Sequence, residues 1–368
     1  MRKTLFKWHS VCALIAMIPL LVIAITGSIL VFKVEIDTWL MPEHMTVPAT
    51  AQQPRQNLNA LKSTVESAHP DFVLGSWELF DDKSRSDAVY LISKQDGEWY
   101  KLYLNQYTGD LLSEPVSVTH DITDWLLSLH YTFLMGVAGT SLGFIFALML
   151  FFLSISGMIL YRQFWKKLFT LRFNAVKRIF FSDVHKLIGI VSSPVLLVIA
   201  LTGAYWNASE VLHEVTEHGD EHVYTNVALY NKEIDFQYLL DSTADHVPDH
   251  RPTYLTFPFE DERHISVFGD VPDKGLLSSE YSSVVTYDRQ TGALMSAYDI
   301  RTASGWNVFV DMFRKLHFGY FAGLTSKIIW CVLGLSPLWL SLTGLYFYLF
   351  RKKKKVAKLV ASTKLVTN

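Results

Sequence analysis

Long apolar runs alternate with polar segments along this chain of 368 residues. Four runs contain at least twenty residues each and no Asp, Glu, Lys or Arg, so each can cross a hydrocarbon core of about 30 Å as a helix. These runs are Val11–Phe32, Val137–Tyr161, Leu187–Trp206 and Ile328–Phe350. The pattern predicts a membrane bundle of four transmembrane helices. Coupled ion transporters keep ionisable groups at mid-membrane, so the lack of such groups disfavours that class of protein.

Lysine and arginine gather in three places: the first seven residues, the loop between the second and third runs, and the tail after residue 350. Loops rich in these residues stay in the cytoplasm. We therefore expect both termini inside and two long segments outside. The first run is too long for a cleaved signal peptide and is expected to remain as an anchor. The net charge of −2 says little about partners, and we expect no nucleic acid among them.

Each outer segment contains a helix-like stretch, Leu58–Ala68 in one and Phe236–His246 in the other. Alternating apolar residues follow and run into Thr108-Gly109 and Thr291-Gly292. Period-two alternation that ends in such a turn is typical of a β-hairpin. Each outer segment is therefore predicted to form a small α+β domain with an antiparallel sheet.

The two halves of the chain repeat one another, with a division near residue 175. LLVIAITG in the first run corresponds to LLVIALTG in the third. Two spacings also recur, seventeen residues from a histidine to a Thr-Gly pair and twenty-six from a Leu-His pair to a Ser-Gly or Thr-Gly pair. They join His9 to Thr26 and His185 to Thr202, and His130 to Ser156 and His317 to Thr343. Such self-similarity indicates an internal duplication.

The predicted organisation follows this repeat. It comprises the cytoplasmic N-terminus and first transmembrane helix (1–32), an outer domain (33–128), the second helix (129–161), a cytoplasmic loop (162–184), the third helix (185–206), a second outer domain (207–304), the fourth helix with its outer extension (305–350) and a basic cytoplasmic tail (351–368). If the second helix is continuous, His130 to Tyr161 spans about 46 Å. His130 and His317 are then expected at or beyond the outer rim of the membrane.

Four histidines at matched positions suggest two pairs of axial haem ligands. Neutral imidazole binds iron well, and a low-spin electron-carrying haem needs two axial ligands from facing helices. We expect His9 and His185 to face each other at the cytoplasmic mouth, and His130 and His317 at the outer mouth. Two bis-histidine haem b groups are therefore predicted. The alternative is that each histidine is an ordinary polar residue of the membrane interface, which leaves the equal spacings unexplained.

A further histidine cluster follows the third apolar run. His213, His218 and His222 stand there among several acidic residues. Their spacing differs from that of a zinc-protease helix. We interpret the cluster as a weak outer metal or iron-entry site, and the alternative is a solvated helix end.

These motifs resemble the PepSY-associated transmembrane family, which includes ferric-siderophore reductases. The resemblance rests on His9 with Leu20–Gly27, on His185 with Leu196–Gly203, on the Leu-His pairs at 130 and 317, and on the Thr-Gly turns of the outer domains. It covers about residues 5–352. It implies two periplasmic PepSY-like domains on a haem protein of the bacterial inner membrane. Such a protein would be an oxidoreductase that passes electrons outward to ferric iron in a siderophore or similar chelate.

The electrons must come from a separate donor, because no G-x-G-x-x-G follows a strand to bind a nicotinamide or flavin nucleotide. A quinol or a cytoplasmic reductase is expected in that role. The resemblance also allows a different function, in which a non-enzymatic PepSY module binds or regulates a periplasmic peptidase or signalling partner. A purified protein without haem would favour this second function.

Overall fold

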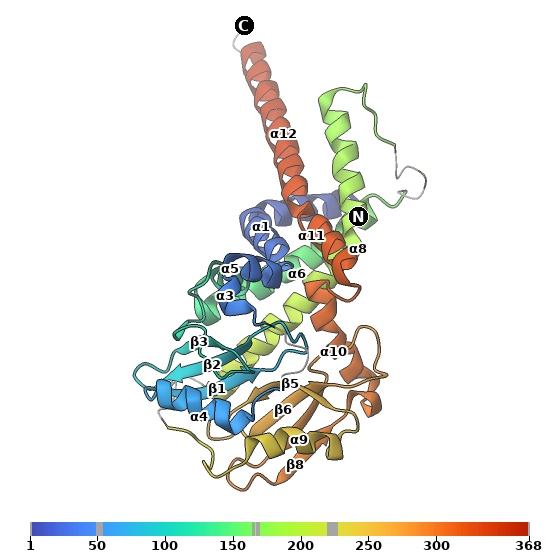
Figure 1. Cartoon of the computed structure of the whole chain (residues 1–368). Coiled ribbons are helices and arrows are strands. Elements are labelled where there is room, and N and C mark those ends of the chain that lie inside the picture. Colours follow the sequence, from blue (N-terminus) through green and yellow to red (C-terminus); the bar gives the residue numbers. More distant parts are fainter. Residues whose placement is uncertain (1, 49–53, 164–165, 167–169, 219–226, 367–368) are drawn as a thin grey trace. The chain divides into compact units, whose positions relative to one another are not determined.

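The protein forms two compact units in the computed structural model (Figure 1). The structure describes all residues except 1, 49–53, 164–165, 167–169, 219–226 and 367–368. The first unit contains Met1–Phe32, Leu126–Glu217 and Leu316–Asn368, and the second contains Lys33–Trp125 and His218–Lys315. Both halves of the sequence therefore contribute segments to each unit.

Helices that are long and apolar enough to cross a membrane build the first unit. They are α1 (Arg2–Leu30), α6 (Gly136–Leu160), α8 (Lys177–His213) and the consecutive pair α11 (Gly323–Gly334) and α12 (Ser336–Val366). A short π-helix, η1 (Glu214–His218), follows α8. All but a few residues of the four predicted apolar runs lie on these helices, and the prediction of four membrane spans is confirmed.

Two shorter helices carry the remaining pair of predicted haem ligands. They are α5 (Ile122–Thr132), which holds His130, and α10 (Gly305–Phe318), which holds His317. The first ends because Phe133 and Leu134 have φ of 50° and 60°, and the second ends at Gly319, with φ of 73°. Left-handed residues cannot continue a right-handed helix. Residues 129–161 therefore do not form one continuous helix, and the span of about 46 Å that depends on continuity does not apply.

Close packing at each break fixes where these short helices end. A Cβ at Gly139 would lie 1.5 Å from the carbonyl oxygen of Thr132, so the end of α5 can pack against α6 only with glycine there. In the other half, the indole of Trp330 lies 2.5 Å from the Cβ position of Gly319, and its Nε1 donates to the carbonyl of Leu316 at 2.6 Å. These contacts also set the positions of the two nearby histidines.

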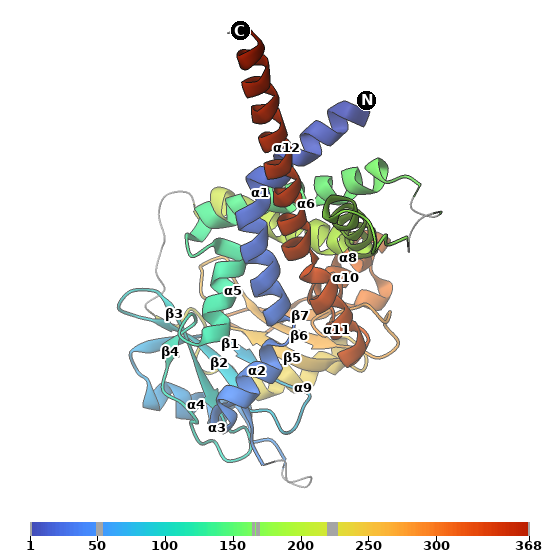
Figure 2. The same cartoon turned by 90° about the horizontal axis from the view of Figure 1, so that it is seen from above.

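A single antiparallel sheet forms the centre of the second unit (Figure 2), with the strand order β4-β3-β2-β1-β5-β6-β7-β8. The strands are β1 (Phe72–Glu78), β2 (Asp87–Ser93), β3 (Trp99–Leu104), β4 (Val116–Ser117), β5 (Arg251–Thr256), β6 (Ile265–Asp270), β7 (Ser283–Tyr287) and β8 (Leu294–Tyr298). The sequence predicts one small sheet in each outer segment. The structure instead pairs β1 with β5, where Trp77 lies opposite Leu255, and so joins the two segments into one unit.

Two amphipathic helices pack on this sheet and share its hydrophobic core (Figure 1). They are α4 (Leu58–Ala68) and α9 (Phe236–His246), with the bounds that the sequence predicts. Asn57 and Asp235 cap them, because each side chain accepts a backbone N–H of the first turn. The remaining short helices of this unit are α2 (Lys33–Leu40), α3 (Pro42–Met45) and the 3₁₀ turn η2 (Ile300–Thr302).

Charged groups with little exposure hold the first turn of α5. One carboxylate oxygen of Asp124 lies 2.9 Å from Nζ of Lys33, and the other oxygen accepts from Lys101. Burial opposes the charge of Lys101, but the carboxylates of Asp124 and Asp121 outweigh burial and hold the pKa of this ammonium above its ordinary value. The network therefore keeps a buried cation charged and ties α5 to strand β3.

Asp311 anchors α10 in a comparable way. Its carboxylate accepts hydrogen bonds from the backbone N and the Oγ of Ser279, at 2.9 and 2.6 Å. It lies six residues before His317, as Asp124 lies six residues before His130. The two short helices that carry these histidines thus have carboxylate anchors at matched positions.

Candidate functional site

His130 on α5 and His317 on α10 face each other and form what we name the α5–α10 pair. Their ring centroids are 6.4 Å apart, with the ring planes at 69°. A metal–imidazole bond is about 2 Å long. Two such bonds, together with the two distances from a ring nitrogen to its ring centre, add up to roughly this separation of the ring centroids. Trp206 packs beside His317, with ring centroids 5.1 Å apart. The geometry suits one iron atom between the two imidazoles.

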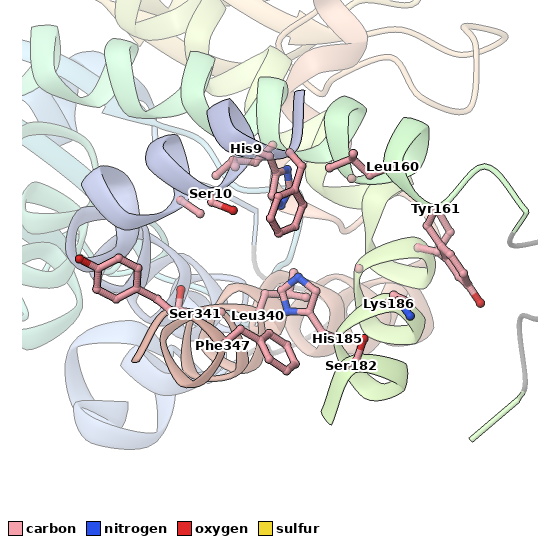
Figure 3. Close-up of a pocket in the computed structure, with 18 of the residues that line it drawn as sticks. His9, Ser10, Leu160, Tyr161, Ser182, His185, Lys186, Leu340, Ser341 and Phe347 are labelled. Atoms are coloured by element: carbon pink, nitrogen blue, oxygen red, sulfur yellow. The ribbon is translucent and has the colours of Figure 1, made fainter. Parts of the chain in front are cut away.

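His9 on α1 and His185 on α8 line one cavity of about 1440 Å³ and form the α1–α8 pair. Figure 3 shows the two rings projecting toward each other from opposite walls of this cavity. Phe347 packs edge-on against His185, with ring centroids 6.1 Å apart. Small-ligand pockets usually measure about 300–1,000 Å³, so this cavity is large enough for a macrocycle.

Each of the four imidazoles is bonded through Nδ1 to the hydroxyl of a Ser/Thr-Gly motif. The partners are His9 and Ser156 at 2.7 Å, His130 and Thr26 at 3.0 Å, His185 and Thr343 at 2.7 Å, and His317 and Thr202 at 2.7 Å. Each hydroxyl also donates to a carbonyl of its own helix. A hydroxyl has one proton, so its oxygen must accept the imidazole N–H. The proton therefore lies on Nδ1, and the lone pair of Nε2 is available to a metal.

The surroundings of His130 support this tautomer independently. Its Nδ1 lies 3.1 Å from the carbonyl oxygen of Ile23, and a carbonyl oxygen can only accept. The proton on Nδ1 thus has two acceptors. Among the described residues, no hydrogen bond reaches the Nε2 atom of any of the four histidines.

The glycine of each motif makes room beside an imidazole or opens onto the cavity. A Cβ at Gly27 would lie 2.6 Å from Cε1 of His130, and a Cβ at Gly203 would lie 3.3 Å from Cε1 of His317. A Cβ at Gly344 would meet nothing within 4 Å, although this residue lines the cavity of the α1–α8 pair. Two of the glycines therefore permit close contact with a ring, and a third leaves a space.

A family model for the PepSY-associated TM region matches residues 6–351. This range covers nearly the whole chain and includes all four histidines and their hydroxyl partners. The chain belongs to the PepSY-associated TM region family. The match confirms the resemblance predicted for about residues 5–352, and with the four apolar helices it identifies a multi-pass membrane protein. No curated protein matches the chain.

In this PepSY-associated protein the structure brings together the histidines that the sequence pairs, and their role as haem ligands stays a prediction. Sequence reasoning missed the hydroxyls, although the Ser/Thr-Gly motifs served as landmarks. The repeated spacing relates Thr26 to His9, seventeen residues away, but in the structure the Thr26 hydroxyl bonds His130. The usable signal was the presence of one Ser/Thr-Gly motif for each of the four histidines. The anchors Asp124 and Asp311 were missed as well, although their equal spacing from a histidine can be read in the sequence.

The predicted outer metal site is largely outside the described part of the chain. His213 ends α8, but residue 222 and the side chain of His218 lie outside the described residues. Among the described residues, no three His, Cys, Asp or Glu side chains come close enough together to hold a metal ion. The metal site of this PepSY-associated protein thus stays a prediction.

Proposed function

We propose that this PepSY-associated protein binds two haem b groups and passes electrons across the bacterial inner membrane to ferric iron in a siderophore or similar chelate. One haem would lie between the histidines of the α1–α8 pair and the other between those of the α5–α10 pair. The observation that carries this proposal is that all four imidazoles have the same hydrogen-bonding arrangement. Each is fixed at Nδ1 by a hydroxyl and presents an Nε2 that no described residue occupies.

Haem, when bound, supplies a reversible one-electron couple between ferric and ferrous iron. His9 with His185, and His130 with His317, would hold the iron from two facing helices, which favours electron transfer over the binding of oxygen. The Ser and Thr hydroxyls hold each imidazole in one tautomer and one orientation. Apolar side chains such as Leu20 and Leu196 line one end of the cavity of the α1–α8 pair and would contact the apolar part of the haem.

The distribution of basic residues supports an orientation in the membrane, and with it a direction for the proposed electron flow. The cavity of the α1–α8 pair is lined by Arg2, Arg178 and Arg351, which belong to the three Lys/Arg-rich regions of the sequence. Such regions stay in the cytoplasm, so this pair would lie on the cytoplasmic side with both termini. Electrons would enter there from a quinol or a cytoplasmic reductase. They would leave from the α5–α10 pair toward the periplasm, where the unit with the large sheet would also lie.

The chemistry of iron explains why one electron is sufficient. Ferric iron is a hard cation that oxygen-rich chelators hold tightly, and ferrous iron binds the same oxygen donors less strongly. One electron added to the iron therefore loosens the chelate, while every covalent bond of the chelator stays intact. The protein would act as a ferric-chelate reductase that supports iron acquisition.

Absorption spectroscopy of the purified protein tests this function. We expect two haems per chain, a Soret band that shifts when dithionite reduces the sample, and reoxidation of that reduced sample by ferric chelates under anaerobic conditions. A chelate of redox-inert Ga(III) is the matched control and should leave the reduced spectrum unchanged. A folded, colourless protein from haem-replete cells would contradict the proposal and favour the non-enzymatic PepSY module.

A further inference from the structure

Basic side chains crowd the cavity of the α1–α8 pair. Among the described residues that line this cavity, seven are Lys or Arg and one, Asp183, is acidic. The carboxylate of Asp183 already accepts from Nε and Nη2 of Arg172, both at 2.8 Å, and Lys186 lies 3.9 Å away. The described lining therefore has a large excess of positive charge.

Aromatic rings, and no carboxylates, hold two of these cations in place. The guanidinium of Arg178 lies 5.4 Å from the ring centre of Phe350, and that of Arg351 lies 4.9 Å from the ring centre of Phe6. An aromatic face attracts a cation without neutralising it. Within the described part of the chain, neither arginine forms an ion pair. Both charges thus remain available to an anion in a concave site, where the field is focused.

The cations and the apolar wall lie on opposite sides of the histidines along the helices. On α8, Arg178 stands seven residues before His185, and Leu196 stands eleven residues after it. The same intervals separate Arg2, His9 and Leu20 on α1, and all six side chains line the cavity. Seven residues of helix correspond to about 10 Å. The cavity therefore has a cationic end, a pair of imidazoles and an apolar end, in that order.

Glycines keep this cavity open for a flat molecule. Gly189 and Gly344 both line it. A Cβ at Gly344 would meet nothing within 4 Å, and a Cβ at Gly189 would meet only Leu340, at 3.6 Å. Any larger side chain at either position would project into the space. The residues present thus fit a flat, mostly apolar ligand that carries negative charge along one edge.

We propose that the cationic end binds the two propionate carboxylates of the haem held by His9 and His185, with Arg178 and Arg351 as the principal partners. This inference rests on the proposed function. Guanidinium groups pair with carboxylates through two parallel hydrogen bonds, which fixes orientation as well as adding affinity. The carboxylate edge of the macrocycle would then point toward Arg178 and Arg351, and its apolar edge toward Leu20 and Leu196.

Titration with haem and with haem dimethyl ester tests this inference, because the ester has the same ring and iron but no carboxylates. The parent protein carries His130→Ala, which leaves the α1–α8 pair as the one intact histidine pair, and the titration follows the Soret band in a lipid-free neutral detergent. We expect the parent to bind haem at least tenfold more tightly than the ester, a difference of about 1.4 kcal/mol. Arg178→Gln/Arg351→Gln should bring the two affinities within about threefold of each other, chiefly because haem binding weakens.

Lys7→Gln is the matched control, because this lysine lies at the same end of α1 and is exposed but does not line the cavity. It should keep the preference for haem over the ester. The inference is overturned if the parent binds both ligands equally, or if the double arginine variant keeps the full preference. The second result would show that Arg178 and Arg351 do not bind the propionates. Failure of the parent to bind either ligand would contradict the proposed function itself.

Salt provides a second measurement that needs no arginine variant. Ion pairs between the guanidinium groups and the carboxylates are screened by added salt, whereas the ester, when both ligands are titrated in the ferrous state, has no net charge to screen. In the parent protein, the affinity for haem should therefore fall between low and high ionic strength, and the affinity for the ester should stay constant. Equal salt dependence of the two ligands would overturn the inference even if the arginine variants do not fold.

Discussion

At the residue scale, the four histidines differ in how many acceptors hold the N–H of the imidazole. Among the described residues, His317 has one acceptor, the hydroxyl of Thr202 at 2.7 Å. His130 has two, the hydroxyl of Thr26 at 3.0 Å and the carbonyl oxygen of Ile23 at 3.1 Å. Loss of the hydroxyl should therefore leave His317 without a partner but leave His130 with one.

Thr202→Val removes the acceptor of His317 and nearly preserves the shape of the side chain. We expect affinity for the haem of the α5–α10 pair to fall about 10- to 100-fold, the usual effect of losing a partner that orients a metal ligand. Thr202→Ser should restore the affinity for haem. Thr26→Val should lower that affinity by a smaller factor, because His130 keeps the carbonyl oxygen of Ile23 as an acceptor. Haem titration of the apoprotein and the midpoint potential of that haem measure the effect. Unchanged affinity and potential in Thr202→Val would show that the hydroxyl does not position the ligand.

The sequence predicts which histidines meet, but it could not predict which hydroxyl each one bonds. Equal spacing identifies equivalent positions in the two halves, and equivalent helices of a bundle can face each other. A hydroxyl partner depends on how a second element packs, since Thr26 and His130 are 104 residues apart and lie on different helices. Local periodicity carries no information about a contact of that kind.

At the scale of elements, the break between α5 and α6 sets the position of His130. The chain reverses through the left-handed residues Phe133 and Leu134, and Gly139 then accommodates the carbonyl of Thr132. Nothing in the residue types of Phe133 and Leu134 indicates a positive φ, which bulky side chains rarely adopt. Hydropathy therefore predicts the apolar run correctly and misses the helix break beside it.

Gly139→Ala tests this arrangement, because the new Cβ would lie 1.5 Å from the carbonyl oxygen of Thr132. We expect a loss of about 1–3 kcal/mol of stability, typical of overpacking, together with weaker haem binding by the α5–α10 pair. Thermal unfolding and haem content measure the two effects. Gly305→Ala is the control, since a Cβ there meets nothing within 4 Å. Equal behaviour of the two alanine variants would show that the α5–α6 contact does not position His130.

Glu78 at the end of β1 gives the second unit a dependence on pH. Burial raises the pKa of this carboxyl above its ordinary value, against the opposing influence of Arg85 and Arg314. The stability that it contributes is fully present below its unfolded-state pKa, and it is lost as pH rises through the raised folded-state pKa. Ionised Glu78 should therefore destabilise the folded protein near neutral pH.

Glu78→Gln removes the ionisable group and keeps an acceptor for Tyr281, whose hydroxyl lies 3.3 Å from the carboxylate. We expect the melting temperature of the variant, relative to the natural protein, to rise by about 2 °C or more between about pH 4 and pH 7. Unfolding scans in detergent at the two pH values provide the comparison. A constant difference in melting temperature would show that Glu78 is not buried enough to shift its ionisation.

At the scale of the whole molecule, both halves of the chain contribute residues to each histidine pair. Every hydroxyl that orients an imidazole comes from the same half as that imidazole. Every histidine pair, in contrast, takes one ring from each half, as His130 and His317 do. Each half thus orients two of the four histidines through its own hydroxyls. An iron atom would be bound by one histidine from each half.

The second unit also joins the halves, through the pairing of β1 with β5. The sequence predicts the strands and the helices α4 and α9 within each outer segment, because alternation and caps are local signals. It does not predict their fusion into one sheet, because two edge strands far apart in the chain pair through backbone groups that every residue carries. Separate domains and one continuous sheet therefore have the same sequence pattern.

Haem content of double histidine variants tests the central proposal most directly. His9→Ala/His185→Ala removes both ligands of one pair and should retain one haem per chain, because the α5–α10 pair stays intact. His9→Ala/His317→Ala removes one ligand from each pair and should retain none at stoichiometric level, although it also loses only two imidazoles. The proposal is contradicted if the two double variants hold equal amounts of haem, or if both hold as much as the natural protein.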